Sequence, residues 1–153
     1  MDAATNERLT RVGPGQPGGD LMRCFWQPVA LVDEFDPQLD ARMGIRPVKK
    51  VRLLGQELVL FRDEQGRWAL LDRDCPHRGA DLSFGRYEGD GLRCPFHGWK
   101  FDVTGQCVDT PAEPEGSKLC SRIQQRRYPV QEASGVLFAW LGVNLAEQAG
   151  VYG

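Results

Sequence analysis

The feature that most constrains this chain is a short motif that occurs twice. The first copy reads CPHRG and begins at Cys75, and the second reads CPFHGW and begins at Cys94. In each copy a proline follows the cysteine, and a histidine and a glycine come shortly after. Sixteen residues separate His77 from Cys94, which is enough for a hairpin-like excursion between two loops. We therefore expect a fold in which the two motifs meet at one site.

The motifs supply four candidate ligands, namely Cys75, His77, Cys94 and His97. Two thiolates and two imidazoles would suit a tetrahedral zinc ion, and they would also suit an iron–sulfur cluster. Zinc fingers commonly have one pair of cysteines and one pair of histidines, with the histidines on a helix. Here each motif contains one cysteine and one histidine. Gly79 and Gly98 would let backbone N–H groups approach inorganic sulfides without an intervening Cβ. The pattern favours a cluster and leaves zinc as an alternative.

Composition limits the class of protein. A chain of 153 residues with 41% hydrophobic and 26% charged residues is expected to fold as one globular domain. Its formal net charge of −2 shows no basic excess, so we expect no nucleic-acid partner. No apolar run approaches the ~20 residues of a membrane helix, and residues 1–20 lack the apolar centre of a signal peptide. We therefore expect a soluble, cytoplasmic protein without a membrane partner.

Short apolar segments alternate with turn residues along most of the chain. This pattern predicts strands at residues 48–54, 57–62 and 67–72, with turns at residues 55–56 and 63–66. It also predicts a hairpin over residues 99–108 that turns at residues 102–105, and two last strands over residues 127–142 that meet around residues 133–135. Pro28 suggests that the segment around it lies at a sheet edge. No stretch keeps a helical period over three turns. The expected fold class is all-β, an antiparallel sandwich or small barrel.

The domain organisation expected from the sequence has three parts. Residues 1–20 are rich in glycine and polar side chains and are predicted to be a flexible arm. Residues 21–142 hold the strands and both motifs and are predicted to be the domain itself. Residues 143–153 are predicted to be a C-terminal tail. Within the domain, residues 36–47 are expected to be an irregular connection or a single helical turn, and residues 110–118 a loop.

Taken together, the two motifs are similar to the Rieske [2Fe–2S] motif. The resemblance extends from about Cys24 to Gly142. The family that it indicates is that of the Rieske non-heme iron oxygenases that hydroxylate aromatic rings, of the phthalate-dioxygenase type. Within that family the chain resembles the N-terminal domain of the large subunit. It implies a Rieske-like fold with two cluster-binding loops and one [2Fe–2S] cluster. By the resemblance, Cys75 and Cys94 bind one iron, and His77 and His97 bind the other.

The chain departs from this family in one respect. The family passes electrons to a mononuclear iron held by two histidines and a carboxylate. This chain has two histidines in total, and the resemblance assigns both to the cluster. We therefore expect no catalytic residues and read the catalytic domain as absent, so that the chain is an oxidoreductase component. The expected partners are a reductase or ferredoxin as electron donor and an oxygenase catalytic domain or subunit as acceptor.

Two other functions stay open from the sequence. One is a stand-alone Rieske ferredoxin-like electron carrier, and the other is a zinc-binding module without redox activity. Respiratory Rieske proteins have extra cysteines where Ala80 and Phe96 stand here, and a serine where Trp99 stands. Fewer hydrogen bonds to the sulfides would leave the reduced cluster less stable, so we expect a potential near ~−150 mV, the low end of the Rieske range.

Overall fold

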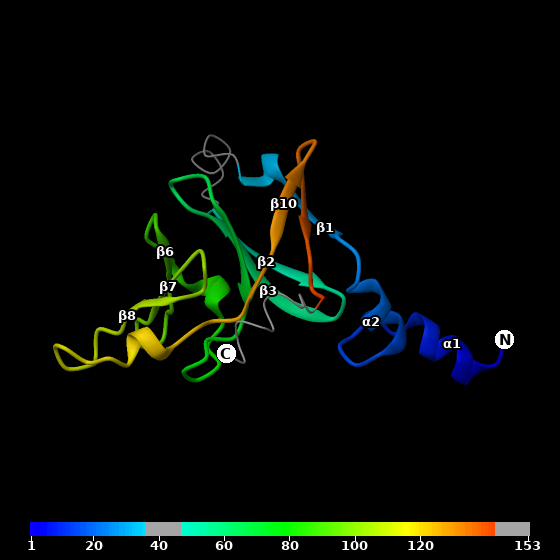
Figure 1. Cartoon of the computed structure of the whole chain (residues 1–153), viewed down its shortest axis with the longest axis horizontal. Coiled ribbons are helices and arrows are strands. Elements are labelled where there is room, and N and C mark those ends of the chain that lie inside the picture. Colours follow the sequence, from blue (N-terminus) through cyan, green and yellow to red (C-terminus); the bar gives the residue numbers. More distant parts are fainter. Residues whose placement is uncertain (36–46, 143–153) are drawn as a thin grey trace.

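The computed structural model describes residues 1–35 and 47–142. Within these residues the chain is mostly β and forms three antiparallel sheets, with two short α-helices at the N-terminal end (Figure 1). The predicted all-β antiparallel class is therefore confirmed. The predicted connection over residues 36–47 (all but its last residue) and the predicted tail at residues 143–153 lie outside the described residues.

The central sheet has the strand order β2-β3-β4-β9. Its strands are β2 (Val48–Leu53), β3 (Gln56–Arg62), β4 (Trp68–Asp72) and β9 (Arg127–Tyr128). The turn between β2 and β3 lies at Leu54 and Gly55, with φ of 48° and 74°, one residue earlier than the sequence suggested. Positive φ at both central residues is typical of the two-residue hairpin turn whose twist matches the strands. Asp63 forms the next turn by accepting hydrogen bonds from the N–H groups of Gln65 and Arg67.

A second sheet has the order β1-β11-β10 and lies at the right of the central sheet in Figure 1. Its strands are β1 (Gln27–Leu31), β10 (Val130–Ala133) and β11 (Val136–Ala139), and a 3-10 turn, η1 (Val32–Phe35), follows β1. Pro28 lies in β1, an edge strand, where its missing N–H removes no interior hydrogen bond. The expected edge position is confirmed.

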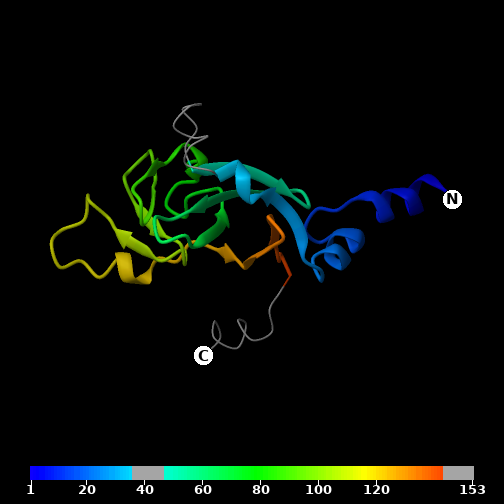
Figure 2. The same cartoon turned by 90° about the horizontal axis from the view of Figure 1, so that it is seen from above.

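The third sheet has the order β5-β6-β7-β8 and lies at the left in Figure 1. Its strands are β5 (Arg86–Tyr87), β6 (Gly91–Arg93), β7 (Lys100–Asp102) and β8 (Cys107–Asp109). Two 3-10 turns flank it, η2 (Leu82–Phe84) before β5 and η3 (Cys120–Arg122) after β8. Residues 110–119, in the segment predicted to be a loop, connect β8 to η3 and project from the sheets in both Figures 1 and 2.

Strands β3 and β4 are buried on both faces, which divides the interior into two cores. The odd-numbered residues Val59 and Phe61 of β3 face core A, which also contains Leu92 of β6 and Phe101 of β7. The even-numbered residues of β3 face core B, together with Leu137 of β11. Burial of both faces explains why β3 is a continuous apolar run, LVLF, and not an alternating one. The central sheet is therefore the layer shared by both cores.

The N-terminal region contains two helices that the sequence analysis did not predict, α1 (Ala3–Thr10) and α2 (Pro17–Met22). Asp2 caps α1, because its side chain accepts a hydrogen bond from the N–H of Thr5 at 2.8 Å. Both helices extend away from the sheets in Figures 1 and 2. Whether this arm is flexible, and whether the domain begins at residue 21, stay predictions.

Arg23 links the end of α2 to the rest of the fold. Its guanidinium donates to the carbonyl of Val12 at 3.0 Å and to that of Leu54, in the turn between β2 and β3, at 2.8 Å. In the part of the chain that the structure describes, no helix is long and apolar enough to cross a membrane.

The two-core arrangement predicts that buried leucines on either side of the central sheet contribute similarly to the free energy of unfolding. Leu60 in core B and Leu92 in core A are both fully buried. Replacing either with alanine should lower the free energy of unfolding by about 2–5 kcal/mol, through lost burial and a residual cavity. Leu31→Ala, at a side chain that is 53% exposed, is the control and should change it by less than about 0.5 kcal/mol. Denaturant unfolding measures all three, and equal effects of Leu60→Ala and Leu31→Ala would contradict the two-sided burial of β3.

Candidate metal centre

The first motif loop, residues 75–80, follows β4 and leads into η2. The N–H of Cys75 donates to the carbonyl of Ala80 at 2.9 Å, and the N–H of Gly79 donates back to the carbonyl of Cys75 at 2.8 Å. Gly79 has φ of 70°, which L-residues with a Cβ rarely adopt. Asp81 closes the loop, because its carboxylate accepts from the N–H of Ser83 at 2.9 Å and caps η2.

The second motif loop, residues 94–99, repeats this geometry. The N–H of Cys94 donates to the carbonyl of Trp99 at 2.8 Å, and the N–H of Gly98 donates to the carbonyl of Cys94 at 3.2 Å. Gly98 has φ of 77°. The loop connects β6 to β7, which pair antiparallel with Leu92 opposite Phe101. The repeat in the sequence is therefore a repeat of backbone structure, with the same turn built twice.

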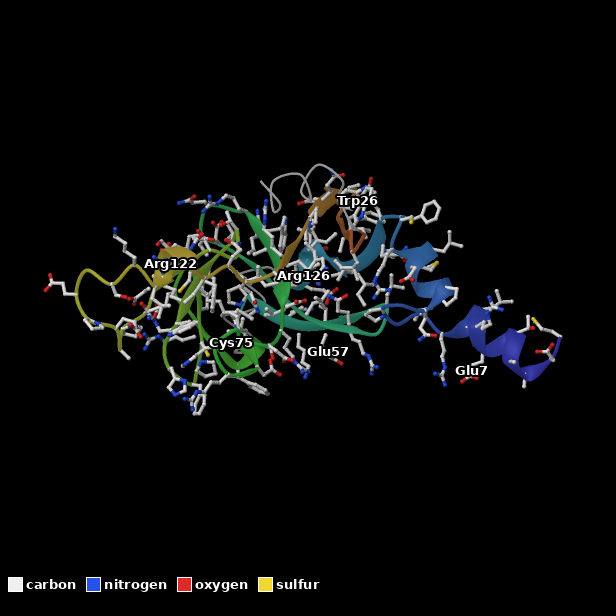
Figure 3. All side chains as sticks on the ribbon, turned by 60° about the horizontal axis from the view of Figure 1, so that its bottom comes forward. Glu7, Trp26, Glu57, Cys75, Arg122 and Arg126 are labelled. Carbon is white, nitrogen blue, oxygen red and sulfur yellow. The ribbon has the colours of Figure 1, made fainter. Side chains whose placement is uncertain are left out.

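The two cysteines of the motifs are buried in core A, Cys75 with 2% and Cys94 with 4% of its surface exposed. Figure 3 labels Cys75 at the lower side of the molecule, away from Trp26 at the upper side. Burial is the main cause that raises the pKa of the Cys75 thiol, to about 11, and the neighbouring Cys94 thiol adds to it. Two adjacent buried thiols would ionise only with a strong positive charge nearby, such as a metal ion supplies.

The two histidines of the motifs also lie together. The rings of His77 and His97 have centroids 4.6 Å apart. Trp99 stacks on His77 at 4.3 Å, and Phe96 lies 4.0 Å from the ring of His97. Burial first, and then the charges of His97 and Arg78, lower the pKa of His77. A neutral imidazole is the form that binds metals.

The buried Nδ1 of His97 has no hydrogen-bond partner among the described residues. A buried polar atom left unpaired is costly, and a metal ligand role would satisfy it. The chemistry of the donors agrees, since thiolates and imidazoles are the ligands of Rieske irons. The residues present therefore fit an iron–sulfur cluster.

The grouping of the donors bears on the zinc alternative. Thiol lies beside thiol and imidazole beside imidazole, so the four donors form two pairs. Two pairs suit two irons with two ligands each better than one tetrahedral zinc ion.

An ion-pair network that the sequence analysis missed supports the second motif loop. Arg93 donates to the carbonyl of Gly98 at 2.6 Å, so one side chain links both ends of that loop. The same guanidinium donates to Asp109 of β8 at 2.8 Å and to both carboxylate oxygens of Glu88 at 2.8 and 3.0 Å. An arginine directly before a motif cysteine was the available sequence signal, but its partners lie on other strands and could not be predicted from the sequence.

Three basic residues of β2 have acidic partners. Lys49 pairs with Glu34, Lys50 lies 3.4 Å from Asp81, and Arg52 lies 3.6 Å from Glu57. Trp99 covers a face of the His77 ring. Arg78 is exposed at the tip of the first motif loop.

Residues 25–130 match the family described as "Rieske [2Fe-2S] domain", which covers both motif loops and most of the three sheets. The chain belongs to the Rieske [2Fe-2S] domain family. Within the family it matches the N-terminal Rieske region of oxygenase alpha subunits of the phthalate-dioxygenase type. Membership of this family implies binding of a [2Fe–2S] cluster.

Curated relatives include the 5,5'-dehydrodivanillate O-demethylase oxygenase subunit of Sphingobium sp., which is 42% identical over 93% of this chain and 32% of its own length. The phthalate 4,5-dioxygenase oxygenase subunit of Pseudomonas putida is 41% identical over 90% of this chain and 30% of its own length. The tert-butanol monooxygenase / tert-amyl alcohol desaturase oxygenase subunit of Aquincola tertiaricarbonis is 43% identical over 92% of this chain and 28% of its own length. The chain thus spans about a third of the length of these relatives.

Among solved structures, dicamba monooxygenase with non-heme iron and dicamba superimposes with a TM-score of 0.66 at 33% sequence identity. The match covers 78% of this chain and 33% of the other. The similarity in sequence is therefore accompanied by similarity in fold.

The two glycines of the motif loops offer a matched pair of substitutions. An alanine at either position would face the strain of positive φ, which costs roughly 1–2 kcal/mol. At Gly98 the new Cβ would also lie 2.9 Å from Cγ of Pro111, whereas at Gly79 it would meet nothing within 4 Å. We expect Gly98→Ala to lower the melting temperature and the cluster content more than Gly79→Ala. Equal losses from both variants would contradict the close contact at Gly98.

The Glu88 network predicts a pH dependence. Hydrogen bonds from Arg93, and then from Arg86, lower the pKa of Glu88 from 4.5 to about 2. A carboxyl with a lowered pKa in the folded state stabilises it fully above pH 4.5, and this contribution is lost as the pH falls towards 2. The free energy of unfolding of Glu88→Gln should therefore lie below that of the unmodified chain at neutral pH, and the gap should narrow in acid. Glu132→Gln, at an exposed position, is the control, and a gap independent of pH would contradict the network.

Proposed function

We propose that this chain is an electron-transfer unit of an oxygenase system. Cys75 and Cys94 hold one iron of a [2Fe–2S] cluster through their thiolates, and His77 and His97 hold the other through imidazole nitrogen. Single electrons pass from a reductase or ferredoxin through the cluster towards a mononuclear iron in an oxygenase catalytic domain or subunit. The observation that carries this proposal is the pairing of the four donors, thiol beside thiol and imidazole beside imidazole.

When bound, a Rieske cluster supplies reversible one-electron oxidation and reduction. The chain's own residues hold and shield it. Core A surrounds the two thiols and excludes water from them. Trp99 and Phe96 cover the imidazole rings from two sides, and both histidines stay partly exposed, so the imidazole side faces the surface from which an electron partner would approach.

The relatives support an oxygenase system over a stand-alone carrier, because the curated relatives reported above are all named as oxygenase subunits. This chain cannot complete a mononuclear iron site of two histidines and a carboxylate by itself, since both of its histidines belong to the motifs. The names of the relatives include both phthalate and tert-butanol, so oxygenase subunits that share this region are named for different substrates. We expect an aromatic substrate and a cytoplasmic location, both from the sequence resemblance and composition.

The cofactor assignment is tested by analysis of the protein purified without air. We expect two irons and two acid-labile sulfides per chain, and an EPR signal that appears on one-electron reduction. Alanine at His77 or His97, or serine at Cys75 or Cys94, should abolish that signal because the cluster loses a ligand. Cys24→Ser, at an exposed cysteine outside the motifs, is the matched control and should keep full iron content. Zinc without sulfide in the unmodified chain would overturn the assignment.

The relay is tested by mixing the cluster-loaded chain with a reductase of an oxygenase system and NADH under anaerobic conditions. The visible absorbance of the cluster should bleach by one electron per chain. Under oxygen the same mixture should hydroxylate no aromatic acid, because the chain has no mononuclear iron site. Bleaching by dithionite without any bleaching by a series of such reductases would argue against the relay while leaving the cluster assignment intact.

A further inference from the structure

Two cysteines outside the motifs lie in contact. Cys107 of β8 and Cys120 of η3 are thirteen positions apart in the sequence, and the thiol of Cys120 donates a hydrogen bond to Sγ of Cys107 at 3.3 Å. Both are free thiols. The sulfurs would need to approach by little more than 1 Å to reach the bonded distance of about 2.05 Å.

The backbone holds this pair in place. The N–H of Cys107 donates to the carbonyl of Ile123 at 3.0 Å, which joins β8 to the residue after η3. The side-chain amide of Gln106 donates to the carbonyls of both Cys107 and Cys120 at 3.1 Å. Hydrogen bonds to the backbone of both cysteines therefore hold β8 and η3 at the separation that brings the two thiols into contact.

The two thiols differ in their access to solvent. Cys107 is buried, and burial, together with the adjacent Cys120 thiol, raises its pKa to about 12. Cys120 is only partly buried, so a reagent in solution can reach it. This asymmetry matches the division of roles in thiol–disulfide exchange, where an accessible thiolate attacks first and a second thiol resolves the mixed disulfide.

We propose that Cys107 and Cys120 form a reversible disulfide site, oxidised by a low-molecular-weight disulfide such as oxidised glutathione. The Cys120 thiolate attacks one glutathione sulfur, forms a mixed disulfide and releases one glutathione thiolate. The thiol of Cys107 then passes its proton to the released glutathione thiolate, and its sulfur attacks Sγ of Cys120 and releases the second glutathione thiolate. Each protein thiol gives up one electron and one proton, and oxidised glutathione becomes two reduced molecules. Neither cysteine is a proposed cluster ligand, although Cys107 shares core A with Cys75 and Cys94.

Closure of this disulfide would act on the second motif loop. The bond would join the two ends of the projecting segment between β8 and η3 (Figures 1 and 2). Asp109, the last residue of β8, directly precedes that segment and pairs with Arg93, and Pro111 within the segment lies against Gly98. A cross-link at its base would restrict the motion of both contacts. The redox state of Cys107 and Cys120 would therefore change how firmly these two contacts hold the second motif loop.

The test uses the full chain with its iron content measured, equilibrated anaerobically over a series of ratios of reduced to oxidised glutathione. Trypsin should release Cys107 in residues 101–118 and Cys120 in residues 119–122, while Cys24, Cys75 and Cys94 fall in three other fragments. We expect the first two fragments to become joined by a disulfide as the ratio becomes more oxidising, with loss of two alkylatable thiols, and to separate again on reduction.

Two variants check the roles. In Cys107→Ala, Cys120 should stop at the glutathione adduct, and in Cys120→Ala, Cys107 should stay a free thiol after the same treatment. Cys24→Ser should still form the cross-link. Unjoined fragments in the unmodified chain at the most oxidising ratio, or a cross-link to Cys75 or Cys94 in place of Cys120, would overturn the proposal. Iron content is read separately, so failure here is distinct from failure of the cluster assignment.

Discussion

The burial of two thiols side by side in one hydrophobic core is the constraint on which the proposed site depends. Cys75 and Cys94 come from different loops, and only the packing of the third sheet against the central sheet brings them together. Ionising either thiol there is unfavourable without a compensating charge, because burial penalises the thiolate. A metal centre would provide that charge, so folding and cluster binding are expected to stabilise each other.

Much of the fold could be predicted from local chemistry. The turn at Asp63 to Gly66, the hairpin at Asp102 to Gly105 and the final hairpin at Ser134 and Gly135 all form where acidic, polar and glycine residues interrupt apolar runs. Each turn is fixed by its own residues, and so the sequence was sufficient. The candidate site was equally readable, because the motif carries its four donors and its two glycines in one short pattern.

Other features depend on contacts between distant parts of the chain and were not readable. The pairing of β1 with β11 joins residues more than a hundred positions apart. The hydrogen bonds from Arg93 to Asp109 and from Cys120 to Cys107 exist only in the folded third sheet, which brings these distant residues together. The helix α1 was missed for another reason. Its signal was the single capping residue Asp2, and its eight residues bury no side chain, so no hydrophobic period marked it.

The most direct measurement is the magnetic coupling of histidine nitrogen to the reduced cluster. The chain would be produced with ¹⁵N-labelled histidine, reduced by one electron and studied by pulsed electron–nuclear double resonance. With only His77 and His97 present, the account predicts strong couplings from two directly bound nitrogens, and loss of the cluster signal when either histidine is replaced. A [2Fe–2S] signal without ¹⁵N coupling would mean that the histidines do not bind the reducible iron, and would contradict the central claim.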